Sequence, residues 1–211
     1  MGDQIMFARF AARAASEGAD VTVLTPTPLA RLFRSMPVEV VEARGAAEFP
    51  DPDYWVMSSD IAGRAGATLE TLPSAPYLSA QPGTSSVVGV AWRGNPAFRN
   101  DANRSLPPDL GERLLALPGA VSLAPEDSGA RDFQDTAEII AGLDLVVSVD
   151  TAVAHLAGAL GKPVWILVPD LTTDWRWMQH RIDSPWYPTA RLWRGGDWRP
   201  VVEAIERELA R

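Results

Sequence analysis

Short apolar runs alternate with helix-like segments along most of the chain, which is typical of βαβ units that build a largely parallel sheet. In the first part, this pattern predicts two helices and three strands. The helices are expected over 4–17 and 29–35, and the strands over 21–24, 38–41 and 54–57. Three prolines and a glycine between Thr71 and Thr84 then mark a linker.

A second series of elements follows this linker. It predicts strands over 86–92, 120–123, 145–149 and 164–168, and helices over 107–117, 135–143, 151–160 and from Asp197 to the end of the chain. We therefore expect two α/β halves, over residues 1–80 and 86–211, joined by a linker over 81–85.

Residues 144–168 form the most informative unit. An apolar strand ends at Asp150-Thr151, a short alanine-rich helix carrying His155 follows, and Gly161 ends that helix before the next apolar run. At the carboxyl edge of a parallel sheet, the free N–H groups at the start of such a helix bind phosphorylated ligands. Asp150 and Thr151 equally suit a plain N-cap, and a lone histidine is as often a packed residue as a functional one. Local sequence leaves both alternatives open.

Composition narrows the classes of function. The formal net charge of −8 argues against a nucleic-acid partner, because a phosphate backbone needs clustered cations. The absence of cysteine excludes disulfides and thiolate metal sites, and two histidines do not make a histidine-rich metal centre. Carboxylates remain able to hold magnesium, but we predict neither a metal site nor a cofactor. No apolar run reaches the roughly 20 residues of a transmembrane helix, and the start lacks a signal-peptide pattern, so a cytoplasmic protein is expected.

The polar loop over residues 93–105 follows a strand and carries three arginines, among them Arg93 and Arg104. Arginine forks suit phosphate oxygens, and the position at the carboxyl end of a strand favours a ligand site over a merely solvated loop. Asp135 with Glu138 three residues later predicts a capping-box start for the following helix.

Five tryptophans occur between residues 175 and 198. We expect most of them to pack in a core, with Asp174 and Trp175 as the favoured exceptions near a ligand.

Together these residues resemble glycosyltransferase family 9, the heptosyltransferase-like enzymes of the GT-B type, and in particular the variants often found with tetratricopeptide arrays. The resemblance spans nearly all 211 residues. Its motifs are Gly2-Asp3, Val90-Ala-Trp-Arg-Gly-Asn-Pro96, Asn103-Arg-Ser-Leu-Pro107, Asp132-Phe-Gln-Asp-Thr-Ala137, Val147-Ser-Val-Asp-Thr-Ala-Val-Ala-His-Leu-Ala157, Asp174-Trp-Arg-Trp177 and Ser184-Pro-Trp-Tyr-Pro188.

The resemblance implies two Rossmann-like halves, with a nucleotide-diphosphate sugar bound mostly by the second. It implies inverting, metal-independent transfer to a glycan, lipid or protein acceptor. Asp3 matches the catalytic base, and Arg104 matches a cation that neutralises the departing nucleotide. The implied donor site comprises Trp92, Arg93, Asn95, Asp150, Thr151, Ala152, His155 and Asp174.

Family members carry a strand and a glycine-rich turn before the Gly-Asp pair, whereas this sequence starts at Met1-Gly2-Asp3. A truncated first half is therefore expected, or a start further upstream, and an unpaired sheet edge would favour a homodimer. Beside a glycosyltransferase, two alternatives remain. One is a GT-B-derived module that binds a nucleotide or nucleotide sugar without catalysis. The other is a sugar-nucleotide epimerase, which is ranked last because acids and histidines are sparse.

Overall fold

The computed structural model describes residues 1–45 and 51–210. Five parallel strands form the main sheet, in the order β4-β3-β5-β6-β7. They are β3 (Ser86–Ala91), β4 (Ala120–Ser122), β5 (Leu143–Val149), β6 (Val164–Pro169) and β7 (Ala190–Gly195). The chain leaves β3 for β4 on one side and later enters β5 on the other side. The carboxyl ends of β3 and β5 therefore form the switch point at which open α/β sheets bind ligands.

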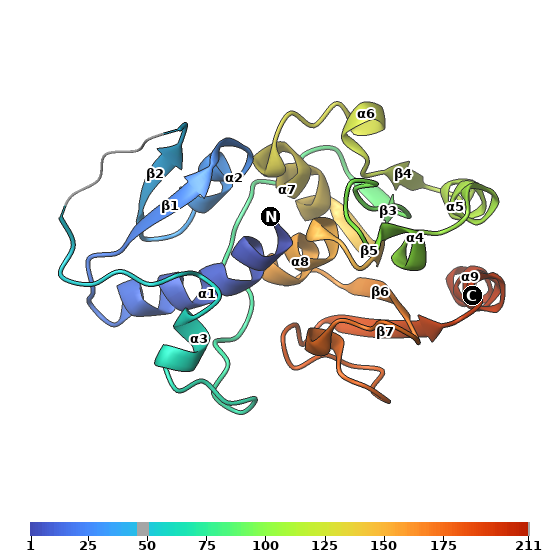
Figure 1. Cartoon of the computed structure of the whole chain (residues 1–211). Coiled ribbons are helices and arrows are strands. Elements are labelled where there is room, and N and C mark those ends of the chain that lie inside the picture. Colours follow the sequence, from blue (N-terminus) through green and yellow to red (C-terminus); the bar gives the residue numbers. More distant parts are fainter. Residues whose placement is uncertain (46–50, 211) are drawn as a thin grey trace.

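Helices cover both faces of this sheet (Figure 1). One face packs on α5 (Pro108–Leu115) and α9 (Trp198–Leu209), and the other on α7 (Phe133–Ala141) and α8 (Ala152–Ala159). Successive strand residues alternate between the faces: Leu145 and Val147 join the first core, and Val146 the second. The three remaining short helices of this part are α4 (Asp101–Arg104), α6 (Pro125–Ser128) and the 3-10 turn η1 (Trp175–Trp177).

The first part of the chain adds a smaller sheet in which β1 (Thr22–Pro26) pairs in parallel with β2 (Glu39–Ala43). Its helices are α1 (Gly2–Ser16), α2 (Thr27–Phe33) and α3 (Ile61–Arg64). In Figure 1, α1 runs between this small sheet and α8, and α2 lies beside α7. The predicted α/β class with parallel sheets is confirmed, whereas the domain boundaries and the truncation of the first half stay predictions.

Small residues on α8 allow its neighbours to approach closely. A Cβ atom at Gly158 would lie 2.3 Å from the ring of Tyr187, and one at Gly2 of α1 would lie 2.9 Å from the ring of His155. Alanines 154, 157 and 159 are fully buried in the same core as Ile5 and Met6 of α1. α8 is therefore enclosed by β5, β6, α1 and the segment that carries Tyr187.

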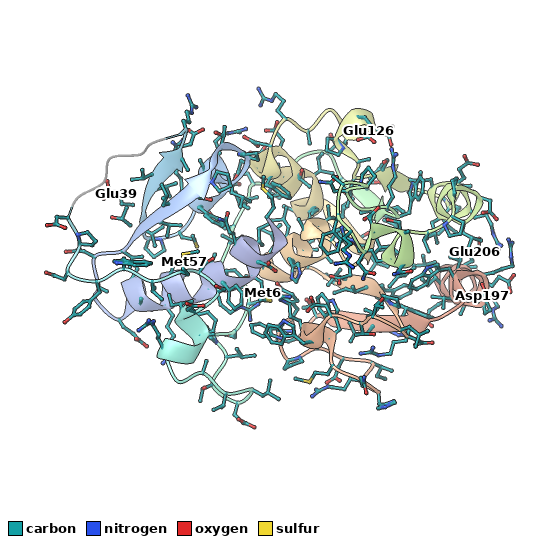
Figure 2. The ribbon with its side chains drawn as sticks, in the orientation of Figure 1. Met6, Glu39, Met57, Glu126, Asp197 and Glu206 are labelled. Atoms are coloured by element: carbon teal, nitrogen blue, oxygen red, sulfur yellow. The ribbon has the colours of Figure 1, made fainter. Side chains whose placement is uncertain are left out.

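The strand expected over 54–57 was wrong. Tyr54 and Trp55 are 93% and 79% exposed, and the segment, on which Figure 2 labels Met57, has no strand pairing among the described residues. An apolar run with β-propensity becomes a strand only when it finds a ladder partner and a face to bury. No strand of residues 51–210 extends the small sheet beyond β2.

Two further details differ from the sequence prediction. Helix α7 begins earlier than expected, because the Asp132 carboxylate, and not that of Asp135, caps it by accepting N–H groups from Gln134 and Asp135, each at 3.0 Å. Strand β7 was not predicted. Arg191 lies over the ring of Trp193 at the edge of the sheet, with 4.3 Å from the guanidinium carbon to the ring centroid. Because aromatic and cationic residues are mixed along this strand, its sequence does not show the alternation of apolar and polar residues that is typical of a strand.

Within residues 1–45 and 51–210, no helix is both long and apolar enough to cross a membrane.

The packing of α8 predicts that Gly158→Ala destabilises the fold. The added methyl group would overlap the Tyr187 ring, so we expect the free energy of unfolding to fall by about 1–3 kcal/mol in urea titration. Gly63→Ala is the matched control, because that helical position has no atom within 4 Å of the new Cβ and should gain up to about 1 kcal/mol. Equal stabilities of Gly158→Ala and the parent would contradict the close packing.

Candidate functional site

A cavity of about 1070 Å³ opens at the carboxyl ends of β3 and β5. All ten site residues expected from the sequence line it, although they come from separate segments of the chain. They are Asp3, Trp92, Arg93, Asn95, Arg104, Asp150, Thr151, Ala152, His155 and Asp174. The structure therefore brings the predicted residues together, and their individual roles remain predictions.

The N-terminus of α8 lines the cavity. Thr151 is the N-cap by position, with extended backbone, but no side chain caps the helix and its first turn holds no acidic residue. The Thr151 hydroxyl lies 3.3 Å from that of Ser148. The sequence left open whether these residues cap the helix; Thr151 takes the N-cap position, but neither side chain makes a capping hydrogen bond. N–H groups at an uncapped helix start, together with the helix dipole, suit an anion.

Arg104 lies over this helix start. Its Nη1 donates to the backbone carbonyl of Asp150 at 2.6 Å, and its Nε donates to the Asp101 carboxylate at 3.0 Å. Asp101 also accepts from Ser105 Oγ at 3.0 Å. A Cβ at Gly94 would lie 2.1 Å from Asp101, so the glycine of the Trp-Arg-Gly-Asn-Pro segment leaves room for this network. The guanidinium is therefore held in place beside the anion-binding groups.

His155 lines the cavity but is only 5% exposed. Its ring stacks on Trp177 with centroids 5.3 Å apart, and its Nδ1 lies 2.9 Å from the hydroxyl of Tyr187. Burial, helped by the charges of Arg176 and Arg9, lowers the pKa of His155 from 6.5 to about 3. The imidazole is therefore neutral at physiological pH, so it can offer an anion a hydrogen bond but no charge.

Asp150 is a partly buried carboxyl beside this imidazole. Burial raises its pKa above the ordinary 3.8, against the opposing effects of the Trp177 indole and the Arg104 guanidinium. Its Oδ1 lies 4.0 Å from Nε2 of His155.

Arg176 was missed by the sequence reasoning, although the quoted Asp174-Trp-Arg-Trp motif contains it. Its Nη2 donates to Asp3 Oδ1 at 2.7 Å, and its Nη1 donates to both carboxylate oxygens of Asp174, at 2.8 and 2.9 Å. Asp3 is 69% exposed at the side chain. This guanidinium therefore joins the start of α1 to the segment after β6 and orients Asp3 at the rim of the cavity.

The remaining predicted residues form the wall after β3. Trp92 packs on α5, where a Cβ at Gly111 would lie 2.2 Å from its ring. Arg93 stacks over Trp92 and pairs with Glu126, which Figure 2 labels on α6. Asn95 accepts the N–H of Ala97 at 2.9 Å and so shapes the loop. All three therefore have structural contacts as well as a place in the wall.

Metal-ligand clusters are not found here: over residues 1–45 and 51–210, no three His, Cys, Asp or Glu side chains are grouped so that they could hold a metal ion.

Most of the predicted tryptophan packing is confirmed. Trp177, Trp186 and Trp198 are buried, whereas Trp175 is largely exposed and stacks on Arg176.

The cavity lies at the switch point of a parallel sheet, and the uncapped start of a helix lines it. This arrangement is typical of α/β proteins that bind nucleotides. The family model for glycosyltransferase family 9 (heptosyltransferase) matches residues 120–167, the segment that holds Asp150, Thr151 and His155. The resemblance to this family is thereby confirmed over the segment that follows β3.

The chain is also similar to protein FlbA of Caulobacter vibrioides, with 25% identity over 198 aligned residues. The alignment covers 74% of this chain and 33% of FlbA, so the chain spans about a third of the length of that relative. No solved structure matches the chain.

Burial of neutral His155 predicts a pH-dependent stability. The unfolded chain takes up this proton near pH 6.5 and the folded chain only near pH 3, so the free energy of unfolding falls as pH drops through that window. The slope from this group is about 1.4 kcal/mol per pH unit.

Urea titrations between pH 6.5 and 5 measure this slope, and His155→Gln should remove most of it. His180→Asn is the control and should keep the slope of the parent, since asparagine tolerates the positive φ of 61° at that position. An unchanged slope in His155→Gln would show that the buried imidazole does not cause the effect.

Proposed function

We propose that the chain transfers a sugar from a nucleotide-diphosphate donor to an acceptor hydroxyl with inversion. The observation that carries this proposal is the convergence of the family's motif residues on one cavity around the uncapped start of α8. The diphosphate would accept hydrogen bonds from the first N–H groups of α8 and from Arg104. Backbone dipoles and a fixed guanidinium suit a leaving diphosphate, because its negative charge grows as the sugar departs.

Asp3 is the proposed general base. In one step, the acceptor oxygen bonds to the anomeric carbon, the bond from that carbon to the diphosphate oxygen breaks, and the acceptor proton passes to the Asp3 carboxylate. The exposure of Asp3 at the rim and its orientation by Arg176 support this role. The acceptor would be a glycan, a lipid or a protein.

A nucleotide-binding module without transferase activity is the second candidate. One observation favours it: of the described residues that line the cavity, only Met1, Gly2, Asp3 and Pro28 precede the linker. The first half, which would bind the acceptor, therefore contributes far fewer lining residues than the second half, which would bind the donor. The expected homodimer, through the truncated sheet of the first half, and the cytoplasmic location belong to the proposal as predictions from the sequence.

A thermal-shift panel with ADP, UDP, GDP and their sugar conjugates tests the donor site. A ligand that binds only the folded chain raises the melting temperature by mass action, so one base series should stabilise the protein with increasing concentration. The absence of a shift with every member at millimolar concentration would overturn nucleotide binding.

Asp3→Asn tests the chemistry. The amide cannot accept the proton, so we expect the rate of sugar transfer to fall about 10²- to 10⁴-fold, with the Kd of the nucleotide unchanged. Asp20→Asn, an exposed position on the same part of the chain, is the matched control and should keep the parent rate. Equal rates for Asp3→Asn and the parent would exclude Asp3 as the base, whereas nucleotide binding without any transfer would favour the binding module.

Arg104→Ala tests the leaving-group role. If the guanidinium stabilises charge that develops as the diphosphate departs, kcat should fall about 10²- to 10³-fold, and the Kd of the nucleotide should rise far less. Equal losses in kcat and affinity would assign Arg104 to ground-state binding only.

A further inference from the structure

We propose that Tyr187 is a positioning residue that holds His155 in the tautomer with its proton on Nε2, so that the imidazole presents a neutral N–H donor to the ligand of the cavity. This inference rests on the proposed function for the identity of that ligand, a nucleoside diphosphate. It assigns a role to the Ser-Pro-Trp-Tyr-Pro segment, which no part of the proposed mechanism uses.

The geometry on the Nδ1 side is close and enclosed. Tyr187 is fully buried, and its hydroxyl lies 2.9 Å from Nδ1 of His155. The phenol ring fits against Gly158, which is one helical turn after His155 and leaves the space that a side chain would fill. Trp177 stacks on the imidazole at an interplanar angle of 20°. The imidazole is therefore held by contacts on its face and at Nδ1.

The other hydroxyl near Tyr187 belongs to Tyr77. Tyr77 donates its own proton to the Ile5 carbonyl at 3.0 Å and receives an N–H of Arg9 at 3.4 Å. Burial raises the pKa of Tyr187 well above its ordinary value, so that hydroxyl keeps its proton as well. Two acceptors face the Tyr187 proton, the Tyr77 oxygen and Nδ1 of His155, and Nδ1 lies 2.9 Å away. The inference is that Tyr187 donates to Nδ1, which leaves the imidazole proton on Nε2.

The Nε2 side leads to the same tautomer. Asp150 Oδ1 lies 4.0 Å from Nε2, and a protonated Nε2 attracts that oxygen whereas a lone pair would repel it. Gly2 packs on the same edge of the ring, where a Cβ atom would lie 2.9 Å from Cδ2 and 3.6 Å from Nε2. Because His155, Asp150 and Gly2 all line the cavity, this is the edge of the imidazole that an anion can meet.

Cations surround the ring and keep it uncharged. Arg9 on α1, Arg104 on α4, Arg176 on η1 and the amino terminus all lower the pKa of His155, in addition to its burial, while Asp150 is the acid that faces it. A neutral donor with a fixed tautomer needs no reorganisation when the anion arrives. The contribution of His155 is therefore a directed hydrogen bond, and the positive charge of the site comes from arginine.

The tautomer can be read directly from ¹⁵N histidine NMR spectra of the unliganded protein. The chain has only two histidines, so His180→Asn assigns both sets of signals. For His155 we expect a pyrrole-type Nε2 and a pyridine-type Nδ1 throughout the neutral pH range. Tyr187→Phe should shift the signals toward a mixture of tautomers, whereas Tyr77→Phe, which removes a hydroxyl from the same cluster, should leave them unchanged. A protonated Nδ1 in the parent, or unchanged signals in Tyr187→Phe, would overturn the inference.

Affinity for ADP, UDP and GDP supplies the second measurement. If Tyr187 acts through His155, Tyr187→Phe should weaken the binding nucleotide roughly 2- to 10-fold, as expected for one neutral hydrogen bond, and His155→Gln with Tyr187→Phe should add nothing further. Tyr77→Phe should bind like the parent. Additive losses in the double variant would overturn the positioning role. If none of the three nucleotides binds the parent, the proposed function and the donor role fail together, while the tautomer signals still decide whether Tyr187 positions the ring.

Discussion

The narrow surface of α8 is the constraint on which the rest of the site depends. Alanine and glycine on this helix let α1, two strands and the Tyr187 ring approach it at the same time, and larger side chains would separate them. The close approach of α1 brings Asp3 to the cavity, and the contact with Tyr187 places a hydroxyl at His155. The N-terminus of the same helix is left uncapped toward the cavity, so one element carries the packing and the anion-binding groups.

Charge in the cavity is organised by pairing. Arg93 pairs with Glu126, Arg104 with Asp101, and Arg176 with Asp3 and Asp174. An anion that enters therefore shares guanidinium groups with carboxylates already in place, and each guanidinium is held at a fixed position before the ligand arrives. Arg9 behaves differently, since this buried cation is solvated by the carbonyls of Met6, Pro73 and Trp186 and by aromatic rings. Its hydrogen bonds connect the linker and the Trp186 segment to α1, so Arg9 has a structural role and does not bind the ligand.

Much of the architecture could be predicted because it depends on local patterns. The apolar runs that became β3, β5 and β6 lie within a few residues of their expected bounds, since strands buried on both faces read as continuous hydrophobic segments. Segment 54–57 and β7 were misjudged because both depend on pairing: one apolar run found no partner, and one mixed run found β6. The cap of α7 was misplaced by three residues because Asp132 and Asp135 are chemically equivalent candidates.

The sequence by itself determined the fold class, and its resemblance to glycosyltransferase family 9 supplied the group of residues that line the cavity. Those that follow β3 and β5 meet because parallel strands bring their carboxyl ends to one side of the sheet. Only the tertiary structure decided the state of each group. Whether Thr151 caps its helix, whether His155 is charged, and which cation orients Asp3 depend on burial and on partners far away in the chain, such as Arg176 and Tyr187. Such contacts arise from packing between distant segments, and no local spacing encodes them.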